Sequence, residues 1–150
     1  MSTAERFTQT KTQLTTTMAN YYAHSRTNFF RVKDAAKFTA WAKQRGVTVH
    51  CRHGDSEYFT MMPDDSDSGT FPNFDSETDD EIDFAAELAA HLYEDSVAVI
   101  LETGAEKLRY LHGHATAINA QGERIEISLD DIYVLAAQRF PGKEVTRAEY

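Results

Sequence analysis

One short segment of the chain, Val97–Leu101 (VAVIL), is apolar at every position. Successive side chains of a β-strand point to opposite faces of the sheet, so a strand here is apolar on both faces. A strand of that kind belongs in the interior, because either face would otherwise expose hydrocarbon to water. The segment therefore predicts a sheet in which residues 97–101 form a central, buried strand.

The segments around this strand have patterns typical of further strands and helices. Runs of aromatic and β-branched residues bounded by turn residues predict strands, and apolar residues at helical spacing predict helices. The expected elements, in chain order, are a strand at 22–32, a helix at 35–45, strands at 47–52 and 57–62, a helix at 82–93, the strand at 97–101, a hairpin of residues 108–119 and 123–129, and a final helix. This order predicts an α+β fold with three helices and an antiparallel or mixed sheet. Its first six elements match the order of a ferredoxin-like split βαβ unit.

Individual residues set the expected ends of these elements. Asp34 is a good N-cap for the first helix, and Gly46 stands where a left-handed glycine ends a helix. Gly122 suits the turn that closes the hairpin. Residues 128–131 (SLDD) are a variant of the capping box and begin the last helix. The apolar positions of that helix that we expect to face inward are Ile132, Leu135 and Ala136.

Length and composition predict one domain with loose ends. Residues 21–140 form the expected single α+β domain of this 150-residue chain. Residues 1–20 are polar and Thr-rich and predict a disordered arm, and residues 141–150 predict a loose tail. Cys51 is the single cysteine, which excludes an internal disulfide, and no apolar run approaches the roughly 20 residues of a membrane span. We expect a cytoplasmic location and no cofactor.

Charge is divided into blocks along the chain. Residues 1–54 carry nine Lys or Arg and two Asp or Glu, whereas residues 55–106 carry sixteen Asp or Glu and no Lys or Arg. Residues 107–150 carry six of each sign, and the whole chain has a net charge of −9. Two interpretations remain open: the acidic block is an interaction surface, or the basic third lies against it inside the fold.

The most acidic part of that block, residues 63–83, has nine Asp or Glu and three interpretations. Its spacing approaches an EF-hand calcium loop beginning at Asp64, but Pro63 and a predicted strand precede it where the motif needs a helix. A solvated spacer is a second interpretation. We favour the third, a surface that binds a basic partner, with aromatic residues as anchors. The predicted partner-binding residues are Asp64, Asp65, Asp67, Phe71, Phe74, Asp75, Asp79, Asp80 and Glu81.

An alternative function is an enzyme built on metal or thiol chemistry. Cys51 and His53 alternate along one predicted strand, and His112 and His114 alternate along another. If the two strands were neighbours, four ligands of the zinc type would converge, or His53 would activate the Cys51 thiol. The chain lacks the usual zinc spacings, a phosphate-binding glycine loop and a nucleophile elbow, so we expect no catalytic residues.

A second alternative is a nucleic-acid-binding module. The first third of the chain combines aromatic residues for base stacking with cations for phosphate, as several RNA-binding sheets do. The acidic block would repel a polyanion at short range, so direct binding of nucleic acid is the less favoured interpretation. The residues concerned are Tyr22, Phe29 and Phe30 with Arg26, Arg31, Lys33, Lys37, Lys43, Arg45 and Arg52.

Two stretches, YYAHSRTNFFRVKD and GAEKLRYLHGHATAINAQGERIEISLDDIYVLA, resemble small accessory proteins carried on bacterial plasmids and phages. The resemblance covers about residues 20–139. It implies a bacterial cytosolic setting and a role against a host system, since anti-restriction and anti-CRISPR inhibitors of this kind are often small, acidic and not enzymes. The expected function is a non-enzymatic acidic protein that occupies a basic surface of a partner and inhibits a host nucleic-acid-binding or defence protein, such as a nuclease.

Overall fold

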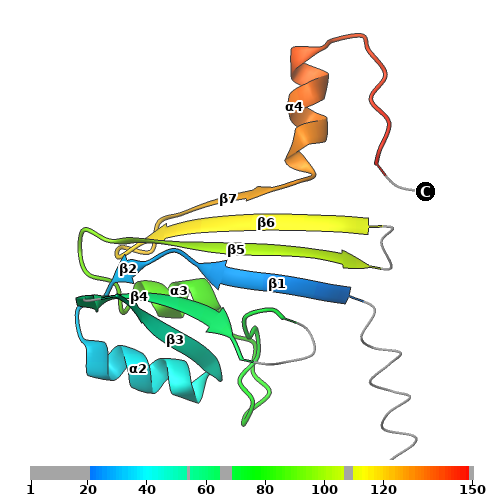
Figure 1. Cartoon of the computed structure of the whole chain (residues 1–150). Helices are drawn as coiled ribbons and strands as arrows, with labels where there is room; N and C mark the ends of the chain where they lie inside the picture. The colour runs from blue at the N-terminus through cyan, green and yellow to red at the C-terminus, as the bar shows by residue number, and fades with distance from the viewer. Residues whose placement is uncertain (1–20, 54, 65–68, 107–109, 149–150) are drawn as a thin grey trace, which may run out of the picture.

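The computed structural model describes residues 21–53, 55–64, 69–106 and 110–148. These residues form seven strands and three helices (Figure 1). In chain order they are β1 (Tyr21–Thr27), β2 (Phe30–Arg31), α2 (Ala35–Gln44), β3 (Val47–Arg52), β4 (Asp55–Pro63), α3 (Phe84–Ala89), β5 (Val97–Glu106), β6 (Tyr110–Asn119), β7 (Arg124–Ser128) and α4 (Asp131–Arg139). The prediction of an α+β fold with three helices and antiparallel pairing is confirmed.

The strands form two sheets instead of one. A four-stranded sheet has the order β1-β5-β6-β7, and a three-stranded sheet has the order β2-β4-β3. Strands β2 and β3 are both antiparallel to β4 and are connected through α2, so β4 splits a βαβ unit. The first six expected elements therefore pair as in a split βαβ unit, except that the first strand is divided between the two sheets.

That division is at Thr27 and Asn28, within the segment 22–32 that we expected to be one strand. The Asn28 side chain continues the ladder with β5: its Nδ2 donates to Val97 O (3.1 Å) and its Oδ1 accepts from Val99 N (2.8 Å). The main chain then turns away and Phe30 pairs with Phe59 of β4. At the turn, the buried Thr27 Oγ1 accepts the Met61 N–H at 2.8 Å, which joins the two sheets.

The hydrophobic core lies between the sheets and the helices α2 and α3. Helix α2 packs beside β3, and α3 packs against β5 and β6. Phe38 of α2 is fully buried and meets the Phe30 ring edge-on, with 5.6 Å between ring centroids. The other large, fully buried core side chains are Met61, Leu88, Leu92 and Ile118.

The predicted helix ends are correct for α2 and displaced for α3. Asp34 caps α2 by accepting the Lys37 N–H, and Gly46 has the expected left-handed backbone, with φ 69°. Helix α3 is six residues long, shorter than the predicted 82–93, because Asp83 caps its start and the chain leaves the helix after Ala89. The residues that follow return to the sheet region, where Leu92 bridges to Val32.

The prediction for residues 97–101 is correct in one respect and wrong in another. Strand β5 is central, since it lies between β1 and β6. Only one face is covered, because Ala98 is fully buried whereas Val97 and Leu101 are each 46% exposed. The core helices pack on the Ala98 side, and the opposite face is open.

Helix α4 also differs from its prediction. Ile132 and Leu135, expected to face inward, are 59% and 56% exposed, and α4 has no buried residue. Figure 1 shows α4 standing away from the rest of the molecule, at the end of β7. The described part of the tail runs beside it: Ala148 N donates to Tyr133 Oη at 2.7 Å. None of the described helices combines the length and the apolar composition needed to cross a membrane.

Replacing Asn28 tests the role of its side chain at the division between the sheets. Asn28→Ala removes two hydrogen bonds to β5, so we expect the free energy of unfolding to fall by about 1–3 kcal/mol. Asn28→Asp keeps the acceptor for Val99 N and should lose less. Denaturant unfolding of both variants provides the measurement.

The matched control is Asn73→Ala, because no hydrogen bond of the Asn73 side chain is observed among the described residues. We expect this change to alter stability by less than about 0.5 kcal/mol. Equal effects of the Asn28 and Asn73 changes would contradict the role given to Asn28.

Candidate interaction surfaces

Residues 73–83, called the acidic loop below, form a small closed structure. Asp75 N donates to Asp80 O at 2.8 Å, and Ile82 N donates to Asn73 O at 2.9 Å. Phe74 and Glu81 are joined by an isolated antiparallel β-bridge. Several backbone groups of the loop are thus paired within the loop itself, which gives these residues a defined shape.

Asp75 holds this loop to the body of the protein. Its Oδ1 accepts the Glu77 and Thr78 N–H groups at 2.8 and 3.0 Å. Its Oδ2 accepts Arg45 Nη1 at 2.7 Å. Arg45 also binds Glu87 of α3 through two hydrogen bonds, from Nε at 2.8 Å and from Nη2 at 3.0 Å. One arginine at the end of α2 therefore joins the acidic loop to α3.

The electrostatics of this cluster follow from its contacts. The hydrogen bond from Arg45, helped by the Thr78 and Glu77 N–H groups, lowers the pKa of Asp75 from 3.8 to about 2. Burial alone raises the pKa of Glu87, but hydrogen bonds from Arg45 and from Trp41 Nε1 outweigh it, and the pKa is lowered. Both carboxylates are therefore ionised near neutral pH and share one cation, Arg45, which leaves the cluster with one net negative charge.

The carboxylates that follow Asp75 as far as Glu81 have no such partner. They are all exposed, and within the described ranges no cation forms an ion pair with Glu77, Asp79, Asp80 or Glu81. Asp79 has a left-handed backbone, with φ 63°, a conformation that Asp tolerates better than most residues. The turn thus presents three successive carboxylates to solvent.

The other predicted partner-binding residues divide into different environments. Phe74 is 53% exposed beside the carboxylates. Phe71 instead stacks on Phe84 of α3, with 4.9 Å between ring centroids, and packs against the core. Asp64 accepts a hydrogen bond from Thr48 Oγ1. Asp65 and Asp67 lie outside the described residues.

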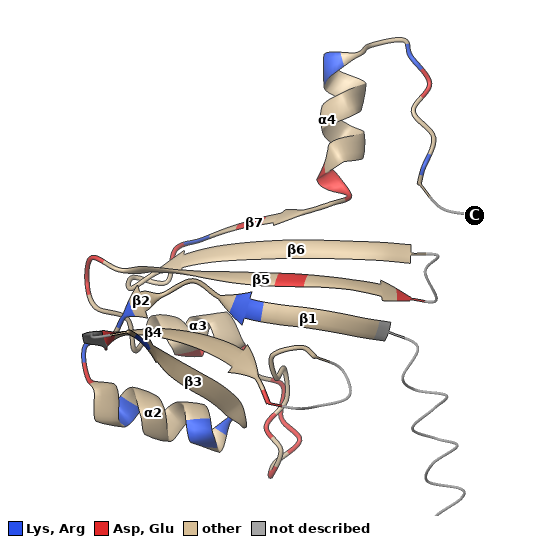
Figure 2. Ribbon diagram, viewed as in Figure 1, with Lys and Arg blue, Asp and Glu red and all other residues tan. Residues whose placement is uncertain are grey.

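The interpretation of the charge blocks as internal pairing is therefore correct in part, and the interpretation of the acidic block as an interaction surface stays a prediction. Figure 2 shows the acidic loop close to the end of α2, whose basic residues belong to the first third of the chain. Arg45 binds Asp75 and Glu87 there, and Arg31 binds Glu57 at 2.9 Å. From the last third of the chain, Arg124 binds the N-cap Asp83 at 2.8 Å. Internal pairing accounts for these acids and leaves the turn at 79–81 unpaired.

The structure does not bring the four metal or thiol candidates together. Cys51 is on β3 of the three-stranded sheet, whereas His112 and His114 are on β6 of the four-stranded sheet. His53 follows β3 directly and is exposed. In the described part of the chain no three His, Cys, Asp or Glu side chains are placed to share a metal ion. The thiol of Cys51 is exposed at the edge strand of its sheet.

Some of the aromatic and basic residues considered for nucleic acid binding have other contacts in the structure. Phe30 is buried in the core, while Phe29 is 41% exposed on the turn between the sheets. Arg31 lies over the Tyr93 ring at 4.0 Å and Arg52 over the Tyr58 ring at 3.9 Å. These cations are engaged with the protein's own side chains.

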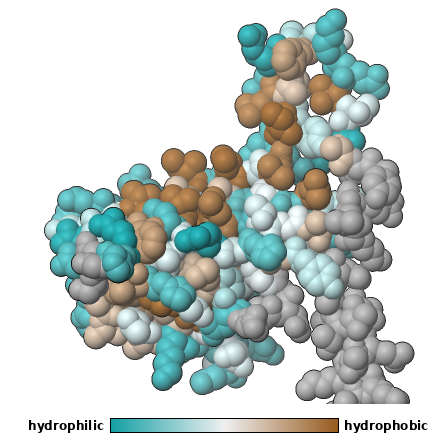
Figure 3. Space-filling view, in the orientation of Figure 1, coloured by the Kyte–Doolittle hydropathy of each residue, from teal (hydrophilic) through white to brown (hydrophobic). Residues whose placement is uncertain are grey.

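A surface that the sequence analysis did not predict is the open face of the four-stranded sheet. Figure 3 shows hydrophobic surface over this sheet and along α4 above it. The exposed apolar side chains of this outer face come from three neighbouring strands and the residue after β7: Val97, Leu101, Leu111, Ile125, Ile127 and Leu129, between 46% and 72% exposed. The sequence signal was present in VAVIL, which is apolar on both faces.

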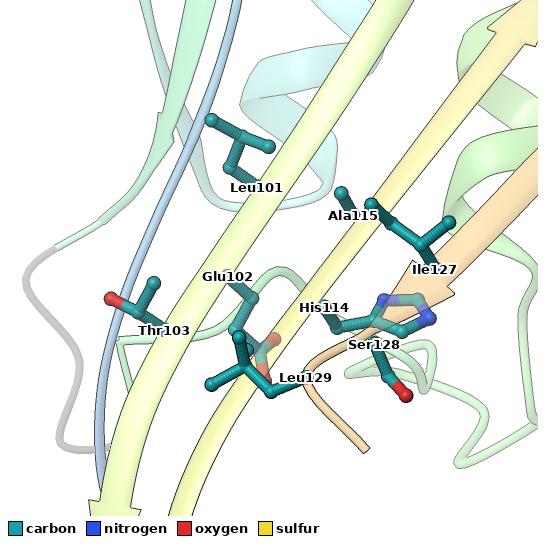
Figure 4. A pocket seen from close by; sticks show the side chains of 9 residues that line it. Leu101, Glu102, Thr103, His114, Ala115, Ile127, Ser128 and Leu129 are labelled. Carbon is teal, nitrogen blue, oxygen red and sulfur yellow. The ribbon is translucent and has the colours of Figure 1, made fainter. Parts of the chain in front are cut away.

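A hollow of about 240 Å³ lies in the outer face, and its walls are almost entirely apolar. Figure 4 shows Leu101, Ile127 and Leu129 around it. Ala115 of β6 lies between these larger side chains and leaves space open, while the Leu129 side chain packs directly on Gly113. The hollow is the size and polarity of a site for one or two apolar side chains of a partner.

Comparisons of the chain with protein-family models, with curated proteins and with solved structures find no match. The resemblance to plasmid and phage accessory proteins therefore stays a prediction. Function has to be argued from the surfaces themselves.

Removing Arg45 should raise the pKa of Asp75. In the folded protein this pKa is about 2, below the ordinary value of 3.8, so the pairing stabilises the fold above about pH 4. That contribution is lost as the pH falls through about 2. We expect the difference in free energy of unfolding between the native chain and Arg45→Met to shrink as the pH falls from about 4 to about 2. We also expect the pKa of Asp75, measured by NMR titration, to move toward 3.8 in the variant.

Arg124→Met is the control, because Arg124 pairs with Asp83 and not with Asp75. The titration of Asp75 should stay where it is in this variant. If Arg45→Met left the pKa of Asp75 unchanged, the attribution to Arg45 would be wrong.

Proposed function

We propose that this protein is a non-enzymatic binding protein that uses the acidic loop to occupy a basic surface of a partner. The observation that carries the proposal is the exposed turn Asp79-Asp80-Glu81, held in a closed loop and without a cation among the described residues. Phe74, 53% exposed in the same loop, supplies an apolar anchor beside the charges.

The internal pairing of Asp75 supports this use of the loop. Because Arg45 fixes Asp75 and Asp75 fixes the N–H groups of Glu77 and Thr78, the loop has little freedom to lose when a partner binds. A binding surface that is already ordered loses less conformational entropy on association. Arg45 therefore contributes to binding by ordering the loop, without touching the partner.

The charge of the chain supports a basic partner. Residues 55–106 carry sixteen acidic residues and no Lys or Arg, and the internal ion pairs leave the carboxylates at 79–81 free. A negative surface attracts a positive one over about a Debye length and accelerates encounter. A basic surface of this kind is typical of nucleases and other nucleic-acid-binding proteins, where bound carboxylates would compete with phosphate. Inhibition of a host defence protein is the form of this function that we favour.

A charge-reversal variant tests the proposal directly. In the loop variant, Asp79→Asn, Asp80→Lys and Glu81→Lys are combined, with Asn at position 79 because it tolerates the left-handed backbone. Proteins captured from a bacterial lysate by the native chain are identified, and the affinity of each purified protein is measured at low salt and at about 0.5 M salt. We expect binding of the partner to weaken at least about tenfold in the variant, which corresponds to about 1.4 kcal/mol.

The control carries equal charge changes elsewhere in the chain: Glu94→Gln, Asp95→Lys and Glu123→Lys, all at exposed positions. If binding depends on the loop, the control variant retains most of the affinity. We also expect the native chain to displace nucleic acid from the captured protein when it binds. If the two variants weaken binding equally, only net charge matters, and the proposed role of the loop is wrong.

A further inference from the structure

Helix α4 is an apolar helix that buries nothing. Ile132, Leu135 and Ala136 fall on one side of it by helical spacing, and the first two are 59% and 56% exposed. A helix of nine residues is marginally stable alone in water, because most helical stability comes from packing of an apolar side. Helix α4 therefore needs a surface that covers this side.

The outer face of the four-stranded sheet has the shape to receive a helix. Gly113, Ala115 and Ala117 follow one another along this face of β6. Larger side chains border them, from Leu101 of β5 on one side and from Ile127 of β7 on the other. Ala115 and Ala117 thus form the floor of a groove between two apolar ridges, and the Leu129 side chain, which packs on Gly113, closes one end of it. The hollow beside Ala115 is part of this groove.

Within one chain, the junction between β7 and α4 keeps the helix off this groove. Leu129 N donates to Gly113 O at 2.9 Å, and the Leu129 side chain lies so close to Gly113 that a Cβ there would come within 2.7 Å of Leu129 Cγ. Ser128 N donates to Asp131 Oδ2 at 2.8 Å. These contacts fix the start of α4, and Figure 1 shows the helix directed away from the body.

We propose that the occupant of the groove is a second copy of this chain, and that two copies exchange their α4 helices about a two-fold axis. In that arrangement each outer face receives the Ile132–Leu135 side of the other copy's helix. A two-fold interface is self-complementary, so the same contact between helix and groove is made twice. Both apolar surfaces of each copy are then covered, and no uncovered surface is left to add further copies into a fibre.

The outer face and α4 both supply exposed apolar side chains for such a dimer. Six outer-face side chains are between 46% and 72% exposed, and Ile132 and Leu135 of the entering helix are 59% and 56% exposed. A stable interface of ordinary size buries about 800 Å² on each partner and has an apolar centre. Burying both faces of β5 would also give residues 97–101 the environment that their sequence predicts.

The charges favour a second copy at this surface in particular. Residues 129–148 carry Asp130, Asp131 and Glu144 against Arg139, Lys143 and Arg147, which leaves a net charge of zero. The acidic block that would make two copies repel belongs to residues 55–106, and its exposed turn is on the acidic loop, near the end of α2 (Figure 2). The segment that enters the other copy therefore carries no net charge, and both acidic loops stay available.

Sedimentation equilibrium of the full chain tests the proposal. At about 1–100 µM, the range in which interfaces of this size associate, we expect a mass of twice the 17.0 kDa chain. Ile132→Asp should raise the dissociation constant at least about tenfold, because it places a charge on the side of α4 that enters the groove. Val134→Asp is the matched control, since Val134 is equally exposed at 59% but lies on the other side of α4. Fluorescence of Trp41, which lies on α2 and packs against the core, checks that each variant is folded.

Single-cysteine chains distinguish exchange from closure of α4 onto its own sheet. In a Cys51→Ser background, chains with Leu135→Cys are mixed with chains with Ala115→Cys and oxidised. A disulfide between the two kinds of chain supports the exchange. The exchange would be wrong if the native chain were monomeric, or if Ile132→Asp and Val134→Asp had equal effects. It would also be wrong if the disulfide formed only in a chain that carries both Leu135→Cys and Ala115→Cys. None of these outcomes bears on the acidic loop, which is tested by its own charge reversal.

Discussion

The arrangement of this protein depends on the hydrogen bonds at Thr27 and Asn28. The Asn28 side chain substitutes for a peptide group opposite β5, so the ladder of the four-stranded sheet continues although the main chain has turned away. The Thr27 hydroxyl accepts the Met61 N–H and ties β4 to the same point. The segment 22–32 can therefore contribute a strand to each sheet, and the hydrophobic core lies between the two sheets.

A consequence of two sheets is that the molecule has two distinct surfaces. Helices α2 and α3 pack on the core side, and Arg45, at the end of α2, binds both the acidic loop and α3. No described helix of the same chain covers the opposite face of the four-stranded sheet, and α4 projects beyond it. The acidic loop is suited to a charged partner, and the outer face is suited to an apolar one. The proposed function and the proposed dimer use different parts of the fold for this physical reason.

The sequence predicted most of the local structure correctly, because local structure follows from local chemistry. Asp34 and Gly46 set the ends of α2, and Gly122 has the left-handed backbone of the hairpin turn, with φ 87°. The environments of the candidate site residues could not be predicted. A run of acidic residues indicates charge but not which carboxylates are paired, so the sequence could not show that Asp75 binds Arg45 and Phe71 stacks on Phe84 while Asp79 is exposed.

The amino-acid sequence by itself determined which segments become strands and helices, that β5 is central, and that the chain is divided by charge. The tertiary structure decided which acids are paired, because Arg45 and Asp75 are 30 positions apart and meet only through the packing of α2 beside the loop. It also decided that one face of residues 97–101 is open. Periodicity reports that a face is apolar, whereas only the positions of the other elements determine whether anything in the same chain can cover it.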